Sequence, residues 1–133
     1  MRKGGFTLVE LVMVIVILGI LAAVAIPTFF NLQAEARKSA VKGALGGLRS
    51  GIAIWYAKEA TSGTAAWPTI VELTKASDGV MAGGRLPPNP YAGDGTLNTV
   101  EAGTSHNSVT SKAWTYDAAT GNIWATGPET TAF

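Results

Sequence analysis

The chain has 133 residues and a formal net charge of +1, with 47% hydrophobic and only 14% charged residues. This length allows one small domain. The near-neutral charge, with no basic cluster beyond the N-terminus, argues against nucleic acid as a primary partner. The sequence contains no cysteine, which excludes disulfides, thiolate zinc sites and thiol catalysis.

The first predicted element is an apolar helix. From Phe6 to Ile26 the sequence carries a single charge, Glu10. A helix over this run is about 31 Å long, which is close to the thickness of a bilayer core. Arg2 and Lys3 precede it, so the positive-inside rule places the N-terminus in the cytoplasm and the bulk of the chain on the other side.

A secretory signal peptide is the alternative for this segment. A short basic head, an apolar core and Ala23-Val24-Ala25 would suit cleavage after Ala25 and release a soluble domain. The apolar core, however, exceeds the roughly 7–15 residues of such signals, and Glu10 interrupts it. These two features favour a membrane helix that is retained.

Glu10 is an ionisable side chain inside an apolar segment, which makes it a candidate functional residue. No Lys or Arg lies within one helical turn of it, so no cation of its own helix pairs with it. A cation from another molecule would offset the cost of burying this charge. The alternative is a carboxylate that reaches the membrane interface without a partner.

The stretch Lys3-Gly4-Gly5-Phe6-Thr7-Leu8-Val9-Glu10 resembles the processing site of the type IV pilin and type II secretion pseudopilin family. In that family a membrane peptidase cuts after the glycine, here between Gly5 and Phe6, and N-methylates the new first residue, here Phe6. The resemblance implies that Glu10 pairs with the Phe6 amine of a neighbouring subunit. This pairing would set the stagger between helices, because an unpaired buried charge is far costlier than a paired one.

Two residues weaken the apolar helix. Pro27 removes one backbone donor and clashes with the preceding turn, and Gly19 lies two turns earlier. The family resemblance, which extends to Pro27, implies that the helix between these two residues melts on assembly. Freed backbone groups in lipid need neighbouring helices as partners, so we expect melting only inside a filament.

Beyond Pro27 the helix is predicted to continue to about Ala60. Apolar residues recur at alternating spacings of four and three, which predicts one buried face: Val41, Leu45, Leu48, Ile52 and Trp55. A second row has small residues at every fourth position: Ser39, Gly43, Gly47 and Gly51. Each glycine costs a helix about 1 kcal/mol relative to Ala. The row therefore predicts close packing against the chain's own sheet or an adjacent subunit, with a frayed helix as the alternative.

The rest of the chain is predicted to form a small head. A capping-box pattern at Thr69–Glu72, after Pro68, predicts a short helix that ends near Asp78-Gly79. The proline-rich segment 83–91 cannot be a central strand. Three short strands are predicted at about Leu97–Glu101, Val109–Tyr116 and Asn122–Thr126, with a hairpin turn at 117–121 in which Gly121 has a positive φ.

Together these elements predict an α+β fold, in which one long N-terminal helix packs on a small antiparallel sheet of about three strands. The pilin fold, which the resemblance implies, has the same description. With the processing site that the resemblance implies, the chain is expected to have four segments. They are a cleaved leader peptide (1–5), a transmembrane and filament-core helix (6–27), an amphipathic half-helix (28–60) and a periplasmic globular head (61–133).

The sequence shows no catalytic constellation. His106 is the only histidine, and no Ser-His-acid group, phosphate loop or zinc pattern is present, so we do not expect an enzyme. Calcium is a secondary hypothesis, because major pseudopilins, which this chain resembles, commonly hold calcium in a loop of the sheet. Asp94, Glu101 and Asp117 could supply oxygen ligands, although Asp and Asn also favour turns.

The resemblance implies a structural subunit that waits in the bacterial inner membrane and then joins a helical filament of identical subunits, periplasmic or on the cell surface. Its implied partners are the prepilin peptidase and methyltransferase, an inner-membrane platform protein, an assembly ATPase, minor pilins or pseudopilins and, before assembly, membrane lipid.

Two kinds of filament fit this description. The missing disulfide and the compact head favour the major pseudopilin of a type II protein secretion system. The alternative is the major pilin of a type IV pilus, acting in adhesion, motility or DNA uptake. A membrane-anchored binding module is a third interpretation, for which the sequence offers no concave site.

Overall fold

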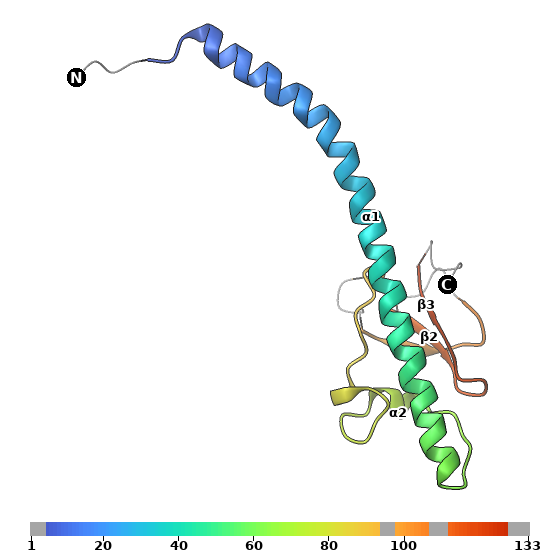
Figure 1. The fold of residues 1–133 in the computed structure, drawn as a ribbon. Coiled ribbons are helices and arrows are strands. Elements are labelled where there is room, and N and C mark those ends of the chain that lie inside the picture. Colours follow the sequence, from blue (N-terminus) through green and yellow to red (C-terminus); the bar gives the residue numbers. More distant parts are fainter. Residues whose placement is uncertain (1–4, 94–97, 107–111, 128–133) are drawn as a thin grey trace. The chain divides into compact units, whose positions relative to one another are not determined.

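The computed structural model describes residues 5–93, 98–106 and 112–127. Its elements are the long helix α1 (Leu8–Thr61), the short helix α2 (Ile70–Thr74), a 3-10 turn (Ala82–Gly84), and the strands β1 (Val100–Ala102), β2 (Trp114–Asp117) and β3 (Asn122–Ala125) (Figure 1). The chain divides into two compact units, Met1–Ala36 and Arg37–Phe133. The boundary falls inside α1, so that one helix contributes to both units.

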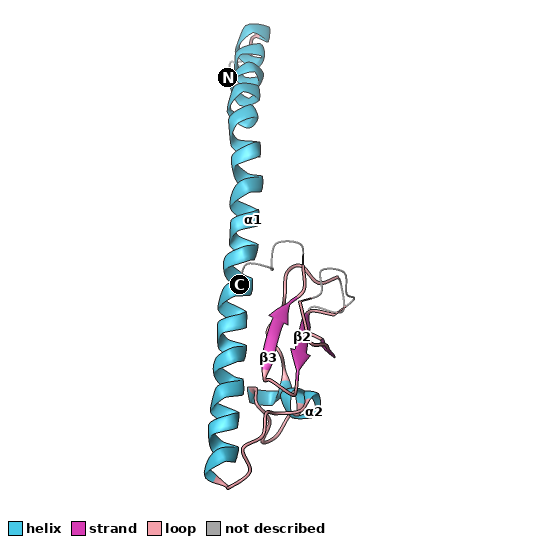
Figure 2. Cartoon of the chain, turned by 90° about the vertical axis from the view of Figure 1, so that its right-hand side faces the viewer, coloured by secondary structure: helices cyan, strands magenta, loops and turns pink. Residues whose placement is uncertain are grey.

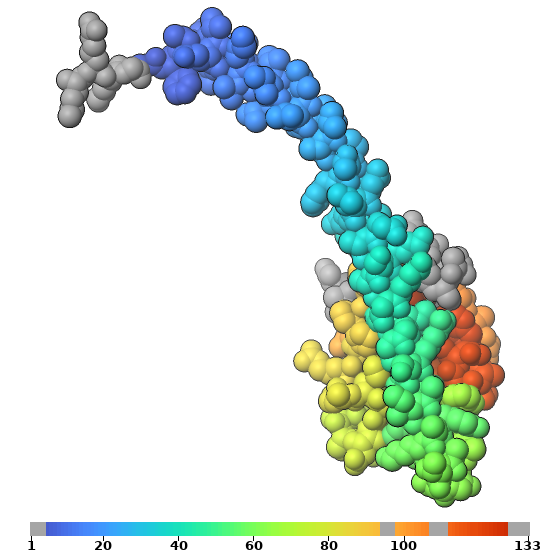
Figure 3. All heavy atoms as spheres, viewed as in Figure 1, coloured from blue at the N-terminus to red at the C-terminus, as the bar shows by residue number. Residues whose placement is uncertain are grey.

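In the first unit α1 has no core. Every described residue from Gly5 to Ala36 is exposed, including Leu8 at 77% and Phe29 at 66%. Figure 3 shows the side chains of this unit in blue to cyan. By length and composition α1 includes a stretch able to cross a membrane. So large an apolar surface indicates that lipid or another protein covers it.

In the second unit α1 buries one face. Val41, Leu45, Leu48 and Ile52 are at most 3% exposed, which confirms the predicted stripe up to its last member, since Trp55 is only half-buried. These side chains join a core that also contains Leu73 of α2, Leu86 of the proline-rich segment and buried residues of β2 and β3. Figure 2 shows the sheet and α2 beside this half of α1. The predicted α+β fold is confirmed.

The sheet has the strand order β1-β2-β3. β2 and β3 form an antiparallel hairpin that ends at the pair Asp117↔Asn122, and Gly121 in its turn has a φ of 73°, as predicted. β1, however, is parallel to β2, with Val100 opposite Trp114. The prediction of an antiparallel sheet is therefore wrong for this pair. The connection 103–113 is far longer than a two-residue hairpin turn and returns the chain to the same end of the sheet.

Strand bounds also differ from the predicted ones. β1 begins at Val100 and β2 at Trp114, whereas the predicted strands begin at Leu97 and Val109, which lie outside the described residues. β3 agrees within one residue with the prediction. Strand ends are the least certain part of a pattern-based prediction, because alternation continues into the flanking loops.

The capping box of α2 is confirmed. The Thr69 backbone N–H donates to Glu72 Oε2 at 2.6 Å, and the Glu72 N–H donates to Thr69 Oγ1 at 3.4 Å. The helix nevertheless ends at Thr74, before the predicted Asp78-Gly79. The Val80 N–H donates to the Glu72 carbonyl at 3.0 Å, so the chain folds back in a tight loop where the helix was expected to continue.

The proline-rich segment is tied to the sheet by buried hydrogen bonds. Asn89 is fully buried, and its Nδ2 donates to the carbonyls of Ala113 at 2.7 Å and Thr126 at 2.9 Å. Trp114 Nε1 donates to the Pro87 carbonyl at 3.0 Å. These bonds join segments far apart in sequence. In a chain without cysteine they supply a cross-connection of the kind that disulfides provide in many small secreted domains.

Candidate functional site

The N-terminus of α1 is closed by a capping box around Glu10. The Thr7 backbone N–H and the Thr7 hydroxyl both donate to Glu10 Oε2, each at 2.8 Å. In return the Glu10 N–H donates to Thr7 Oγ1 at 3.3 Å. The Leu11 N–H also donates to the Thr7 carbonyl, at 3.2 Å. Thr7 is thus the N-cap of a helix that begins at Leu8, and Glu10 is its N3 residue.

Sequence reasoning missed this role of Glu10. The signal was available, because Thr7-Leu8-Val9-Glu10 is the same Thr-x-x-Glu pattern that predicts the start of α2 at Thr69. The capping box gives the carboxylate polar partners within the chain, but no cation. The Glu10 charge is therefore hydrogen-bonded, and within the described residues the capping box places no cation beside it.

The geometry leaves room for a cation at this carboxylate. Both hydrogen bonds end on Oε2, so Oε1 can accept an ammonium group from another molecule. Phe6 is 84% exposed and lies next to the N-cap. An amine created at Phe6 would therefore stand on the surface at the start of the helix, four residues before the carboxylate of Glu10 in its own chain.

The predicted cleavage site precedes the helix. Gly5 and Phe6 lie before α1 begins at Leu8, and no described atom lies within 4 Å of the place where a Cβ on Gly5 would stand. The bond between them is thus in exposed, non-helical backbone, which a peptidase can bind in extended form. Arg2 and Lys3 lie outside the described residues.

The helix is continuous through the predicted melting region. Pro27 lies inside α1, and the Thr28 hydroxyl donates to the Val24 carbonyl at 3.1 Å, which adds a bond next to the position where proline lacks a donor. A Cβ on Gly19 would meet no described atom within 4 Å. Melting between Gly19 and Pro27 concerns an assembled filament and stays a prediction.

The glycine row of α1 divides into two parts. At Gly51 a Cβ would stand 3.1 Å from Met81 Sδ and 3.3 Å from Val80 Cγ1, so this glycine permits close packing inside the second unit. Gly43 and Gly47 are exposed, and a Cβ on either would meet no described atom within 4 Å. The row was predicted to pack against the chain's own sheet or against an adjacent subunit. For Gly43 and Gly47, packing against an adjacent subunit stays a prediction.

The predicted calcium ligands are not brought together among the described residues. Asp117 organises the hairpin turn: its Oδ1 accepts from the Ala119 N–H at 2.9 Å and its Oδ2 from the Thr120 hydroxyl at 2.7 Å. These bonds hold the pKa of the Asp117 carboxyl below its usual value. Glu101 accepts from the Thr115 hydroxyl at 3.5 Å, and Asp94 lies outside the described residues.

No group of three His, Cys, Asp or Glu that could hold a metal ion occurs within the described residues 5–93, 98–106 and 112–127. Asp117 has the role of a turn former, which is the alternative given above for these residues. The calcium site itself stays a prediction, since one of its three proposed ligands is not described.

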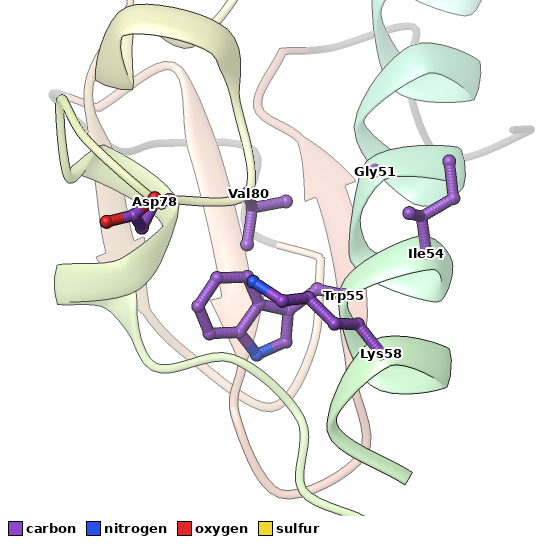
Figure 4. A pocket seen from close by; sticks show the side chains of 7 residues that line it. Gly51, Ile54, Trp55, Lys58, Asp78 and Val80 are labelled. Carbon is purple, nitrogen blue, oxygen red and sulfur yellow. The ribbon is translucent and has the colours of Figure 1, made fainter. Parts of the chain in front are cut away.

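A shallow groove of about 170 Å³ lies between the last turns of α1 and the loop before the 3-10 turn. Figure 4 shows Trp55 and Val80 at its centre and Lys58 beside them. The Lys58 ammonium lies 5.6 Å from the centre of the Trp55 ring, a cation–π distance. The groove thus contains an aromatic ring that is already covered by a side chain of the same helix, and it offers no arrangement for acid–base or nucleophilic catalysis.

Comparisons with known proteins agree with this picture. Residues 1–26 match the prokaryotic N-terminal methylation motif. The chain is 33% identical to the type IV major fimbrial protein FimA of Dichelobacter nodosus, over 97% of this chain and 86% of that protein. No solved structure matches the chain.

Two further relatives match over shorter stretches. The chain is 48% identical to the type IV narrow pilus major component PilA5 of Thermus thermophilus, over 41% of this chain and 47% of that protein. It is 54% identical to the type IV major pilin protein PilA of Myxococcus xanthus, over 31% of this chain and 19% of that protein. The match therefore spans less than half the length of these two relatives.

Proposed function

This chain belongs to the type IV pilin family, and we propose that it is the major structural subunit of a type IV pilus. The observation that carries the proposal is the first unit: a helix whose apolar side chains are exposed on all sides, joined to a second unit with a core of its own. Such a helix is stable in lipid before assembly and against copies of itself afterwards.

The family is one of structural proteins, so the expectation that this chain is not an enzyme is confirmed. The choice between pilus and secretion pseudopilus favours the pilus, because the relatives reported above are pilus and fimbrial proteins. The missing disulfide, one of the two arguments for a pseudopilin, loses its weight. The buried hydrogen bonds of Asn89 cross-connect the second unit without cysteine, and such bonds serve either kind of filament.

Processing is the first step of the proposed function. A prepilin peptidase of the inner membrane cleaves the exposed bond between Gly5 and Phe6, and the new Phe6 amine is methylated. Hydrolysis replaces the uncharged amide with a carboxylate on Gly5, which leaves with residues 1–5, and an ammonium on Phe6, which is a cation that the precursor lacks at this point. The subunit then has a positive charge on the Phe6 amine, just before the capping box, and a negative charge on the Glu10 carboxylate within it.

Assembly is the second step. In the bilayer a lone carboxylate near a helix end is costly, although the Thr7 donors satisfy part of it. In a filament, where apolar side chains replace lipid, pairing of Glu10 Oε1 with the Phe6 ammonium of a neighbouring subunit removes the remaining cost. Only one vertical stagger brings these two groups together, so the pair selects the register.

The proposed partners follow from these steps. They are the peptidase and methyltransferase, a platform protein and an ATPase that extract subunits from the membrane, minor pilins, and further copies of this chain. The subunit would lie in the inner membrane with its second unit in the periplasm, and later in a filament on the cell surface.

The decisive experiment combines imaging and mass measurement. Deleting the gene should remove long surface fibres seen by electron microscopy while secretion of other exported proteins continues, and the intact mass of sheared fibres should correspond to a chain that begins with methylated Phe6. Persistence of the fibres would overturn the proposal, as would a mature N-terminus at Ile26. Loss of protein secretion with no surface fibres at any stage would favour the pseudopilus.

A further inference from the structure

The second unit exposes few large apolar side chains. Among its described residues only Ile54 of α1 and Val71 of α2 are large, apolar and mostly exposed, at 67% and 72%. Ile54 lines the groove between α1 and the loop before the 3-10 turn, whereas Val71 does not. The unit therefore presents one apolar groove and, outside it, one projecting apolar side chain.

The groove has room for one small branched side chain. Its volume is about 170 Å³, and a cavity of about 150 Å³ holds a benzene molecule. Trp55 and Val80, at its centre in Figure 4, supply apolar walls. At Gly51 the wall is bare backbone, so no side chain from this position fills the space.

Val71 is held rigidly on α2. The capping box of Thr69 and Glu72 closes the first turn of this helix, and Leu73 anchors it in the core. A valine side chain has one torsion angle, which branching at Cβ restricts further. Val71 therefore loses little conformational entropy when another surface covers it.

Opposite charges flank both features. Glu72 follows Val71 directly and Lys75 comes one turn after it, while Lys58 and Asp78 line the groove. The projection and the groove thus each carry one anion and one cation. A second copy that inserts Val71 can place Lys75 beside Asp78 and Glu72 beside Lys58, which is the charge complementarity that fixes orientation at an interface.

We propose that Val71 of one subunit inserts into the groove of a second copy of this chain, beside Ile54 and Trp55. The inference rests on the proposed filament and adds to it a contact between second units. Because the projection and the groove are different surfaces, the contact is heterologous, and such contacts continue from copy to copy into open helical chains when the rotation does not close.

The contact is too small to form a stable dimer by itself. One valine and its flanking charges cover far less than the roughly 1,200 Å² of total surface that stable interfaces bury. We therefore expect no pairing of isolated second units. In a filament the first units already hold the subunits together, and a weak contact then gains from the high effective concentration of its partner.

The absence of cysteine from the chain makes disulfide cross-linking a direct test. Cells that assemble fibres produce two full-length variants together, V71C and I54C, whose chains differ in mass. The sheared fibres are oxidised mildly, and the linked pairs are identified by intact mass. Mixed pairs should exceed pairs of like chains by at least about tenfold, because cysteines whose Cα atoms lie more than about 7 Å apart are not bridged.

A double variant and a matched control sharpen this test. V71C/I54C carries both positions in one chain and should give a ladder of linked oligomers, as a contact that continues from copy to copy requires. V71C/A118C moves the second cysteine to the hairpin turn, where Ala118 is exposed, and should give no ladder. Equal ladders from the two variants would overturn the inference, as would a disulfide between positions 54 and 71 of the same chain.

Fibre yield tests the apolar part of the contact. Val71→Ile keeps an apolar side chain and should keep the yield, whereas Val71→Asp should lower it severalfold. The melting temperature of the second unit should not change in either variant, because Val71 is exposed. Normal fibre yield with Val71→Asp would overturn the inference.

Mixed cross-linking also tests the charged part. K75Q and D78N should each weaken it, and K75Q/D78N should weaken it no further, because the two side chains are proposed to pair. Asn tolerates the positive φ of 54° at Asp78, so D78N leaves the loop intact. Fully additive losses would overturn the proposed pairing of Lys75 with Asp78.

The outcomes separate the inference from the proposed function. If fibres form but positions 54 and 71 cross-link no more than the control pair, the inference is wrong and the proposed function stands. If V71C links mainly to V71C, two copies meet across a two-fold axis, which also overturns the inference. If the parent chain forms no fibres, the proposed function falls and the inference falls with it.

Discussion

The two halves of α1 are parts of one continuous helix and contrast in how their apolar side chains are covered. Before Ala36, large apolar residues cover every side of the helix and all are exposed. After Arg37, four apolar residues on one face are almost fully buried, and the other faces carry mainly small or charged residues up to Ile54, Trp55 and Tyr56 near the helix end. The comparison teaches that helix formation depends on residues close in sequence, whereas burial of a helix face depends on another surface that packs against it. The second half finds its partner in the chain, and the first half needs one from outside.

The sharpest way to break the comparison is to change Glu10, the carboxylate at the N-terminal end of the first half. Glu10→Gln keeps the shape and much of the capping but removes the charge that is proposed to pair with the Phe6 amine. We expect ordered fibres to be lost or strongly reduced, with no change in the thermal stability of the second unit in detergent. The measurement is fibre yield by electron microscopy and melting by circular dichroism.

The conservative variant Glu10→Asp serves as the control for Glu10→Gln, because it keeps the charge with a shorter reach and should assemble better. Glu10→Gln fibres that form in normal amount and with unchanged helical geometry would show that this charge pair does not order the subunits.

A second prediction compares the same side chain in the two halves. Leu48→Ala removes a fully buried side chain and should lower the free energy of unfolding of the second unit by about 3 kcal/mol. Leu21→Ala changes an exposed leucine and should leave this free energy unchanged. Urea unfolding in detergent, followed by tryptophan fluorescence, measures both. Equal destabilisation by the two variants would mean that the first half contributes to the core of the monomer.

The capping boxes at the N-termini of α1 and α2 allow the same comparison between the two units, with a smaller expected change in stability. Thr69→Ala should destabilise the second unit by about 1 kcal/mol, because α2 places Leu73 in the core. Thr7→Ala removes an equivalent cap from α1, where no core depends on it, and should leave melting of the second unit unchanged. Its effect should appear in hydrogen exchange of the first turn of α1, which becomes faster. A fall in melting temperature with Thr7→Ala would contradict the independence of the two units.

The smallest expected effect is confined to alkaline pH. The Tyr116 hydroxyl donates to the Pro68 carbonyl at 2.7 Å, and burial, with nearby Asp117 and Glu72, raises the pKa of Tyr116 from 10.0 to about 12. The folded state therefore holds this proton more tightly than the unfolded state. The resulting stability is fully present below pH 10 and is lost as the pH rises towards 12.

Denaturant unfolding of the second unit as a function of pH measures this loss. Tyr116→Phe should be less stable at neutral pH, because the Pro68 carbonyl loses its donor, and its stability should depend less on pH in the alkaline range. A pH profile identical to that of the parent would show that another group is responsible.

Features that depend on neighbours in sequence were predictable. The buried stripe from Val41 to Ile52, the capping box at Thr69, the turn at Gly121 and the helical start near Phe6 all follow from spacing and side-chain type. The capping role of Glu10 belongs to the same class. Its signal is the three-residue spacing between Thr7 and Glu10, which the apolar residues on both sides of Glu10 do not change.

The sequence alone determined that α1 forms, that its first half must be covered by lipid or other chains, and that a processing motif precedes it. These properties rest on short-range spacing and on the number of apolar residues. Only the tertiary structure decided that β1 runs parallel to β2, that Asn89 joins the proline-rich segment to Ala113 and Thr126, and that Gly51 packs inside the chain while Gly43 and Gly47 do not. Each of these features depends on contacts between residues far apart in the sequence, and the spacing of residue types along the chain does not specify such contacts.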